Sequence, residues 1–382
     1  LTGVGVCMPI ILIVSAFASM VGSGGAPRAT IAMGKNEEDQ AEQILGNCVT
    51  LQLIISVILT TVLLTFGRRI LLAFGASENT IEYACEYLNI YAIGTIFVQL
   101  TLGMNTFITA QGFAKIGMLS VLIGAVANIV LDPIFIFGFK MGVRGAALAT
   151  VIAQGLSAAG IALYFFFRLP ELRPRRSNFR LDRPLLSRIA SVSVLTSVQQ
   201  SIMNFGILLV QSLVNSFGVA TMAAFAAGVK IDSFAYSPAQ DFANGFATFV
   251  AQNTGAGKPE RVKQGIREAA LLSLSFCAVV SALVFLFARP LLTLFIDPGE
   301  REILAVGVHY LRVEGVFYVG IGLLFLLYAI YRGLERAGMS VVLTVISLGL
   351  RVALAYAFAP HFGVTAIWLA IPIGWFIADA VG

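Results

Sequence analysis

Long apolar runs separated by short polar intervals make up almost the whole chain. Eleven of these runs are long enough to cross a bilayer as helices, which takes about 20 residues each. The intervals between them carry turn residues and charges, as in GKNEEDQAEQ and IDPGERE. The pattern predicts an all-α polytopic membrane protein. The predicted spans cover approximately residues 3–33, 43–66, 83–109, 116–137, 145–167, 185–216, 220–255, 267–288, 303–331, 338–359 and 364–382.

The few polar residues between positions 128 and 154 are regularly spaced. Asn128 and Asp132 are four residues apart, so they share one face of a helix. Pro133 follows directly, and because it lacks an N–H and its ring crowds the preceding turn, we expect a hinge there. The next helix carries a second i, i+4 stripe, and we predict that both polar faces turn toward one interior point. That second stripe consists of Ala146, Thr150 and Gln154.

An internal repeat relates the two halves of the chain at a shift of 221 to 223 residues. Gly34-Lys35 recurs as Gly257-Lys258, and Gly142-Val143 recurs as Gly363-Val364. The matched segments keep the same order and the same side, so we predict two six-helix bundles in a parallel pseudo-two-fold repeat. The repeat places the partner of 185–216 before residue 1. We therefore expect a twelve-helix, two-lobed transporter fold whose first helix is missing from this sequence and whose last helix is truncated.

The predicted organisation has three parts. Residues 1–168 form an N-terminal lobe with helices 2–6, residues 169–184 form a basic linker, and residues 185–382 form a C-terminal lobe with helices 7–12. The linker contains five arginines, so the positive-inside rule predicts that it lies in the cytoplasm. These arginines are Arg173, Arg175, Arg176, Arg180 and Arg183.

Composition supports a membrane protein and excludes the soluble classes. Of 382 residues, 58% are hydrophobic and only 12% are charged, with a mean hydropathy of +0.90, whereas soluble domains are about 25% charged. The basic residues lie mostly in the intervals, so their surplus indicates membrane topology rather than a nucleic-acid partner. We expect a multi-pass protein of the cell membrane, monomeric, with no cofactor besides a coupling ion.

Asp132 is the strongest candidate for an ion-binding residue. A carboxylate in the middle of an apolar helix costs about 2.5–3.5 kcal/mol. The equivalent positions in the second half hold Ala353 for Asp132, Gly349 for Asn128 and Ile371 for Thr150, so packing does not need these polar groups. Oxygen ligands suit a hard cation such as Na⁺, and removal from water favours a protonated carboxyl group. We predict that Asp132 binds H⁺ or Na⁺ alternately and that its neutralisation rebends the helix at Pro133; the alternative is that Asp132 caps a broken helix.

Three stretches resemble the MATE (multidrug and toxic compound extrusion) transporters, and the likeness extends over the whole chain. They are NIVLDPIFIFGFKMGVRGAALAT at 128–150, PAQDFANGFATFVAQNTGAGK at 238–258 and YRGLERAGM at 331–339. The pattern is most similar to the branch of the DNA-damage-inducible transporters. That resemblance implies a cation site in the N-terminal lobe, to which a helix-1 aspartate without a counterpart here also contributes. The matching positions are Asn105, Asn128, Asp132 and Thr150, with the carbonyl of Ala146, and Na⁺ would bind at Asp132, Asn128 and Thr150.

Other polar residues within the apolar runs are candidates for a substrate cavity. Lys230 and Asp241 lie on the 220–255 helix, which Pro238 should kink, and they either pair or face the cavity. Gln154, Gln199 and Gln200 are further candidates. Arg351 should pair with a carboxylate or reach toward the interface, and Glu314 is either that partner or a second ion site.

These features favour a secondary active antiporter that exports drugs or organic cations in exchange for H⁺ or Na⁺ by alternating access. The expected substrates are small amphipathic molecules. The main alternative is a lipid-linked saccharide or lipid flippase of a related fold, which would need several basic residues in its cleft, whereas mid-span only Lys230 and Arg351 are basic. An enzyme is not expected, because His309 and His361 lie far apart at span ends. A channel would not need a carboxylate in one lobe only.

Overall fold

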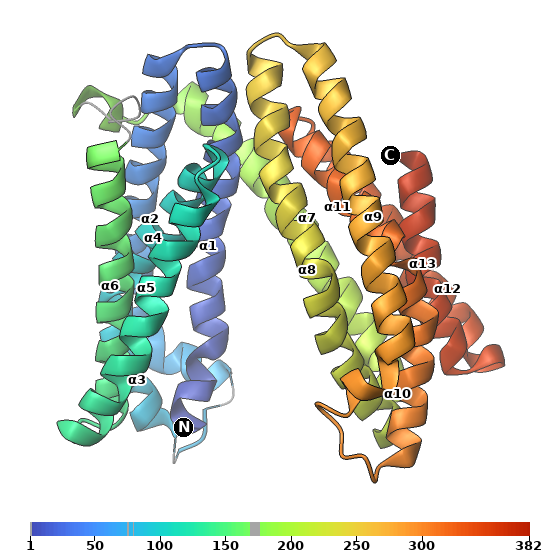
Figure 1. Ribbon diagram of the computed structural model, residues 1–382. Helices are drawn as coiled ribbons and strands as arrows, with labels where there is room; N and C mark the ends of the chain where they lie inside the picture. The colour runs from blue at the N-terminus through green and yellow to red at the C-terminus, as the bar shows by residue number, and fades with distance from the viewer. Residues whose placement is uncertain (1, 75, 79, 169–175) are drawn as a thin grey trace. The chain divides into compact units, whose positions relative to one another are not determined.

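The computed structural model describes residues 2–74, 76–78, 80–168 and 176–382, and within these ranges it is helical without strands (Figure 1). The chain divides into two compact units, Leu1–Val194 and Leu195–Gly382. Of the predicted linker, Arg173 and Arg175 lie outside the described residues. The all-α fold class predicted from the apolar pattern is confirmed.

Unit 1 is a bundle in which helices pack against both sequential and distant neighbours. Helix α1 packs against α2 and α4, and α5 packs against α6. The helices of this unit are α1 (Thr2–Gly34), α2 (Glu38–Ala73), α3 (Ile81–Ile93), α4 (Thr95–Ala110), α5 (Ala114–Pro133), the π-helix η1 (Ile134–Gly138), α6 (Val143–Arg168), the 3₁₀ turn η3 (Arg176–Phe179) and the start of α7 (Arg183–Asn215).

Unit 2 contains the rest of α7 and six further α-helices. Helix α12 packs against α13, and α8 packs against α9, α10 and α11. The remaining elements are α8 (Val219–Gly255), α9 (Pro259–Leu292), α10 (Arg301–Glu314), the 3₁₀ turn η4 (Gly315–Phe317), α11 (Tyr318–Gly333), α12 (Ala337–Phe362) and α13 (Val364–Val381).

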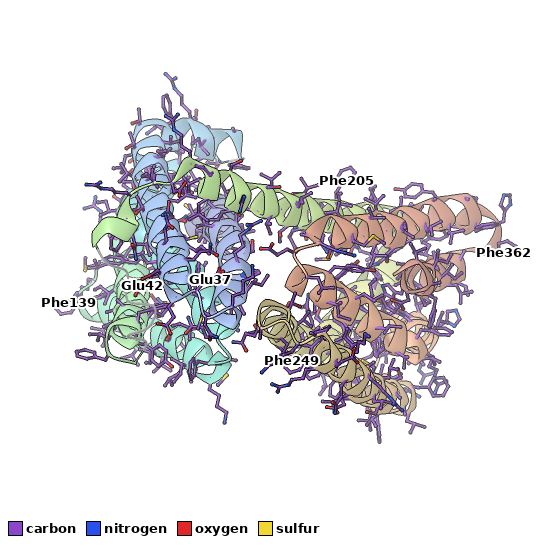
Figure 2. The ribbon with its side chains drawn as sticks, turned by 90° about the horizontal axis from the view of Figure 1, so that it is seen from above. Glu37, Glu42, Phe139, Phe205, Phe249 and Phe362 are labelled. Atoms are coloured by element: carbon purple, nitrogen blue, oxygen red, sulfur yellow. The ribbon has the colours of Figure 1, made fainter. Side chains whose placement is uncertain are left out.

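Nine helices of the described residues are long and apolar enough to cross a membrane, and α3 with α4 forms a bent pair that makes a tenth span. The eleventh predicted span, 220–255, is helical as α8, but it is less apolar because it carries Lys230, Asp232 and Asp241. Large apolar side chains such as Phe205 and Phe362 point away from the helices and are exposed (Figure 2). This exposed apolar surface is what contact with lipid requires.

Two predicted spans are broken helices, and the breaks occur at equivalent positions of the repeat. Helices α3 and α4 meet at Gly94 with a bend of 55°, and α10 and α11 are joined by η4, which begins at Gly315, 221 residues later. A Cβ at Gly94 would lie 2.5 Å from the Val151 side chain, so α6 packs directly against the first break. The shared break supports the internal repeat.

The turns of the two units repeat as well. Asn36 and Gly257 both have positive φ, and so do Gly142 and Gly363, each pair 221 residues apart. Positive φ is the left-handed region, which favours glycine and tolerates asparagine. The same backbone turn is therefore kept where the side chains differ.

The described part of the linker is held on α2. The Asn178 Nδ2 atom donates to Glu42 Oε2 over 3.0 Å, and the Asp182 backbone N–H donates to Asn47 Oδ1 over 2.9 Å. A Cβ at Gly46 would lie 2.5 Å from the Asn178 carbonyl oxygen. The 3₁₀ turn η3 can therefore lie this close to α2 only because residue 46 is a glycine.

Helical structure continues past both prolines that were predicted to bend a span. Helix α5 continues past Pro133 as the π-helical turn η1. A proline within a helix lacks the backbone N–H that would bond the preceding turn. A π-helical turn is wider and pairs its backbone groups five residues apart instead of four. Helix α8 continues through Pro238 without a break.

Candidate functional site

Asn128 and Asp132 form the centre of a polar cluster in unit 1. Both side chains are half-buried on α5, and Asn128 Nδ2 donates to Asp132 Oδ1 over 3.4 Å. Asp132 occupies the last turn of α5 before the π-helical turn. No side-chain cap of η1 is found in the described structure, which does not support the alternative that Asp132 is a helix cap.

Helix α6 supplies the second side of this cluster. The Thr150 hydroxyl donates to the Ala146 carbonyl oxygen over 2.9 Å. Tyr87 of α3 lies beside Thr150 and within electrostatic reach of Asp132. The sequence reasoning missed Tyr87, although a Tyr-Leu pair at 87–88 recurs at 310–311 and could have drawn attention to it.

A glycine contact sets the spacing between the two polar stripes. A Cβ at Gly145 would lie 2.8 Å from the carbonyl carbon of Phe135 and 2.9 Å from its oxygen. The first turn of α6 therefore packs on the backbone of η1. This contact places Ala146 next to the end of α5 that carries Asp132.

Asn105 is not part of this cluster. Its side chain lies against Gly117, which precedes Asn128 by eleven residues on α5, or about 16 Å at 1.5 Å per residue. The Asn105 Oδ1 atom is buried without a hydrogen-bond partner. Asn105 thus lies at a different depth from Asp132, contrary to the ligand set implied by the resemblance.

Gln154 lies one turn beyond Thr150 on α6. Its backbone carbonyl accepts a hydrogen bond from the Thr101 hydroxyl over 3.2 Å. Its side-chain Oε1 atom is buried without a hydrogen-bond partner. Gln154 therefore extends the polar stripe of α6 but makes no recorded contact with Asp132.

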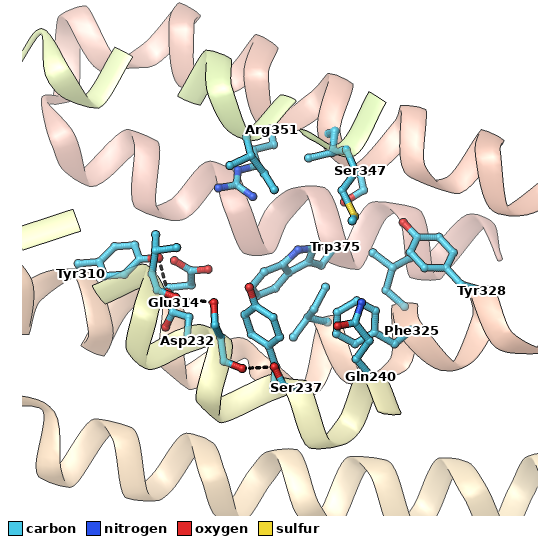
Figure 3. A pocket seen from close by; sticks show the side chains of 18 of the residues that line it. Asp232, Ser237, Gln240, Tyr310, Glu314, Phe325, Tyr328, Ser347, Arg351 and Trp375 are labelled. Atoms are coloured by element: carbon cyan, nitrogen blue, oxygen red, sulfur yellow. Dashed lines mark hydrogen bonds between the residues drawn. The ribbon is translucent and has the colours of Figure 1, made fainter. Parts of the chain in front are cut away.

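Unit 2 contains a cavity of about 290 Å³ lined by several helices. Asp232 of α8 is 2% exposed and accepts hydrogen bonds from the hydroxyls of Tyr310 and Tyr318. Glu314, at the end of α10, and Arg351, on α12, line the same cavity (Figure 3). The sequence analysis left open whether Glu314 is the partner of Arg351 or a second ion site, and it did not select Asp232 as a site residue. The structure places Arg351 within electrostatic reach of both carboxylates.

A smaller cavity of about 70 Å³ adjoins the first and shares Met203, Gln240, Phe325 and Tyr328 with it. Gln199 and Gln200 line this smaller cavity, and their role toward a substrate stays a prediction. Gln199 Nε2 donates to the Thr344 hydroxyl over 3.1 Å. Both cavities belong to unit 2.

The model of the family described as MatE matches residues 1–134 and 196–357. The chain belongs to the MATE family. Its members are transporters rather than enzymes, and this MATE protein is a multi-pass membrane protein. The resemblance seen in the three sequence stretches is confirmed.

Individual relatives agree with this assignment. The chain is 25% identical over 374 residues to the probable multidrug resistance protein YoeA of Bacillus subtilis, covering 95% of this chain and 80% of YoeA. It is 26% identical over 387 residues to an FAD transporter of Shewanella oneidensis, covering 98% and 83%. It also matches the outward-facing structure of a multidrug resistance MATE family transporter, with a TM-score of 0.89, 25% identity and coverage of 100% and 85%.

Two further candidates in this MATE protein lie outside the cavities. Lys230 and Asp241 are both exposed, and Lys230 Nζ lies 5.8 Å from the centre of the Phe295 ring. They are eleven residues apart on α8, which separates them by about 16 Å along the helix. The alternative that they pair is therefore wrong, because they share a face but are too far apart along it.

The unit-1 cluster of this MATE protein offers oxygen donors of three kinds. They are the Asp132 carboxylate, the Asn128 amide oxygen and the Thr150 hydroxyl, and such hard ligands suit Na⁺ or a proton. Asn128 Oδ1 remains available while Nδ2 donates to Asp132. These oxygen donors are of the kind that small hard cations take as ligands.

Proposed function

We propose that this MATE transporter is a secondary active antiporter that exports amphipathic organic cations in exchange for H⁺ or Na⁺. The observation that carries the proposal is the contact of Asp132 with Asn128 one turn before the π-helical turn of α5. An ion bound there changes the charge of a helix end whose backbone already departs from regular α-helix. Such an end can respond to neutralisation by changing its geometry.

The internal repeat supports a coupling role for Asp132. The equivalent positions of the second half are Ala353, Gly349 and Ile371, so the fold can be built without polar groups there. A carboxylate in a membrane span costs free energy and is kept where it serves a function. Asp132 is therefore proposed as the ion-coupling residue, with Asn128 and Thr150 as further ligands.

The names of the relatives guide the choice of substrate. YoeA and the Staphylococcus MepA proteins are described as multidrug resistance or multidrug export proteins. The Shewanella oneidensis relative is described as an FAD transporter, which favours a second candidate in which the exported molecule is a flavin nucleotide. We propose that the chain works as a monomer in the cell membrane with the basic linker in the cytoplasm.

The test is efflux of ethidium from vesicles that contain the reconstituted protein, under an imposed proton gradient or an imposed sodium gradient. We expect one gradient to drive efflux, and we expect Asp132→Asn to reduce it to the level of protein-free vesicles. Glu82→Gln, an exposed carboxylate in the first turn of α3, is the matched control and should export normally. Full efflux by Asp132→Asn would contradict the coupling role, and efflux of FAD but not ethidium would favour the flavin candidate.

A further inference from the structure

The smaller cavity of unit 2 contains a basic residue that ion coupling at Asp132 does not use. Arg332 lies in the last turn of α11 and is half-buried. It lines the cavity of about 70 Å³ together with polar side chains of α7 and α8. A charged side chain within a membrane span is usually kept for a partner or a ligand. The contacts of its guanidinium group show how much of it is already paired.

The guanidinium group of Arg332 is only partly paired. Its Nη2 atom donates to Asn244 Oδ1 over 2.7 Å, and its Nε atom donates to the Tyr328 carbonyl oxygen over 3.3 Å. Both acceptors are neutral. A guanidinium group carries further N–H donors in a planar fork, and those on Nη1 donate to no atom of the described residues. Arg332 therefore has donors left for a ligand.

The charge of Arg332 is not balanced by an acid. Arg351 lies within electrostatic reach of two carboxylates, whereas no carboxylate of the described residues lies within such reach of Arg332. Asp379 of α13 is within electrostatic reach of Tyr328 but not of Arg332. An unpaired charge in a partly buried site is costly. One added negative charge is therefore favourable beside Arg332.

The amide side chains of the same cavity narrow the choice of ligand. Gln199 Nε2 already donates to the Thr344 hydroxyl over 3.1 Å, and Gln200 Nε2 donates to Asn204 Oδ1 over 3.5 Å. The amide of Gln240 forms no hydrogen bond with the described residues. Gln240 and Arg332 thus both keep N–H donors for oxygen atoms. A carboxylate offers two such oxygens and is the preferred partner of a guanidinium group.

The size and the walls of the cavity suit a head group with an apolar body attached. A volume of about 70 Å³ is far below that of a whole small-molecule site, about 300 Å³. Met203 and Phe325 line both this cavity and the larger one, so an apolar body can lie along them. Figure 3 shows Gln240 and Tyr328 at the opposite end of the larger cavity from Tyr310. The donors of this site are thus kept apart from the phenols that bind Asp232.

We propose that the smaller cavity is a subsite for the carboxylate group of an amphipathic organic acid, held by Arg332 and Gln240. One guanidinium group offsets one negative charge, so a carboxylate is balanced there and a dianion is not. The proposal goes beyond the proposed export of organic cations, because it gives unit 2 a place for a negatively charged group. It involves no residue of the Asp132 cluster in unit 1.

The two tryptophans of the chain provide an optical probe of unit 2. Trp368 and Trp375 both lie on α13. Energy transfer from tryptophan to dansylglycine, a ligand with one carboxylate, therefore reports binding to this unit, and substitutions locate the site. The protein is measured at equilibrium in lipid nanodiscs, and the neutral methyl ester of dansylglycine is the comparison ligand.

We expect saturable energy transfer with dansylglycine in the wild type. Loss of the guanidinium–carboxylate contact in Arg332→Gln should weaken binding by about tenfold or more. Arg336→Gln, which removes the same charge from the exposed residue that precedes α12, is the matched control and should bind as wild type does. Benzoate, a monoanion, should displace the probe, and the same concentration of sulfate, a dianion, should not.

Equal affinity of the wild type for dansylglycine and its methyl ester would overturn the proposal, and this comparison does not depend on the folding of any variant. Wild-type affinity in Arg332→Gln, no saturable transfer at all, or displacement by sulfate as strong as by benzoate would overturn it as well. The binding measurement uses no gradient, so its outcome does not depend on coupling at Asp132. Failure of gradient-driven ethidium efflux with intact dansylglycine binding would instead contradict the proposed antiport.

Discussion

Asp232 shows how a carboxylate is stabilised inside a membrane helix. Two phenol groups donate to its two oxygens, and Arg351 lies within electrostatic reach. Hydrogen bonds to a charged group contribute more than those between neutral groups, about 1.5–3 kcal/mol each. Asp132 is held differently, by one longer contact from Asn128 in a half-buried position, and this looser holding is suited to exchange of a cation.

The phenol contacts predict a stability effect. Tyr318→Phe removes one of the two donors to Asp232 and leaves a buried oxygen unsatisfied, so the free energy of unfolding should fall by about 1–3 kcal/mol. The thermal unfolding midpoint of the purified protein in detergent measures the change. Tyr83→Phe, whose ring is 57% exposed, should leave the midpoint unchanged, and an equal effect of both variants would contradict this account of Asp232.

Sequence reasoning found the residues that are linked by local spacing and missed those linked only by tertiary contact. Asn128 and Asp132 share a helix face because they are four residues apart, and the structure brings them together. The phenols of Tyr310 and Tyr318 are 78 and 86 residues from Asp232, and no periodicity of one helix indicates such partners. Asn105 was included by resemblance, but its depth on α4 places it against Gly117 instead.

At the level of elements, the junction of α5, η1 and α6 positions the candidate ion site. The π-helical turn follows Pro133, and Gly145 lets α6 approach the backbone of Phe135. This contact holds the first turn of α6 against the turn that follows Asp132. A π-helical turn follows Pro133 where the sequence predicts a hinge, and the hinge itself stays a prediction.

This junction predicts opposite effects for two glycines of α6. Gly145→Ala would push a methyl group against the Phe135 carbonyl, which should cost about 1–3 kcal/mol and reduce ethidium efflux. Gly160→Ala meets no atom within 4 Å and should stabilise the helix by about 0.5–1 kcal/mol. Thermal unfolding midpoints and efflux of both variants test this, and a stabilising or neutral Gly145→Ala would contradict the proposed junction.

Interruptions inside spans mark the limit of apolar patterns at this scale. Residues 83–109 and 303–331 were each predicted as one span, and each forms one candidate span, but the helix within it is interrupted. Gly94 and Gly315 interrupt them, but glycines elsewhere in the same runs do not. Val151 packs against Gly94 from another helix, but Gly103 and Gly322 have equally close neighbours without a break.

At the scale of the whole molecule, the two units repeat one helix order but differ in chemistry. Equivalent breaks and turns recur 221 residues apart, while the polar residues do not. Unit 1 carries Asp132 on α5, and unit 2 carries Asp232 on α8 and Glu314 on α10. The repeat was readable from short motifs such as Gly142-Val143 because turns with positive φ constrain the residue type.

The distribution of basic residues predicts the orientation of unit 2. The turn around Lys258 carries more positive charge than the loop around Asp297, so the positive-inside rule places it in the cytoplasm. In a background without the four native cysteines, Asp297→Cys should react with an impermeant maleimide on intact cells. Lys258→Cys should react only after the cells are disrupted; the reverse pattern would contradict this orientation and the proposed side of the linker.

The most direct test of Asp132 as the coupling residue compares two modes of transport in the same vesicles. Exchange of labelled for unlabelled ethidium returns the carrier loaded with substrate and needs no net ion movement, whereas uphill efflux needs the coupling ion. We predict that Asp132→Asn keeps exchange and loses uphill efflux under both gradients. Retention of uphill efflux, or loss of exchange together with it, would contradict a coupling role for Asp132.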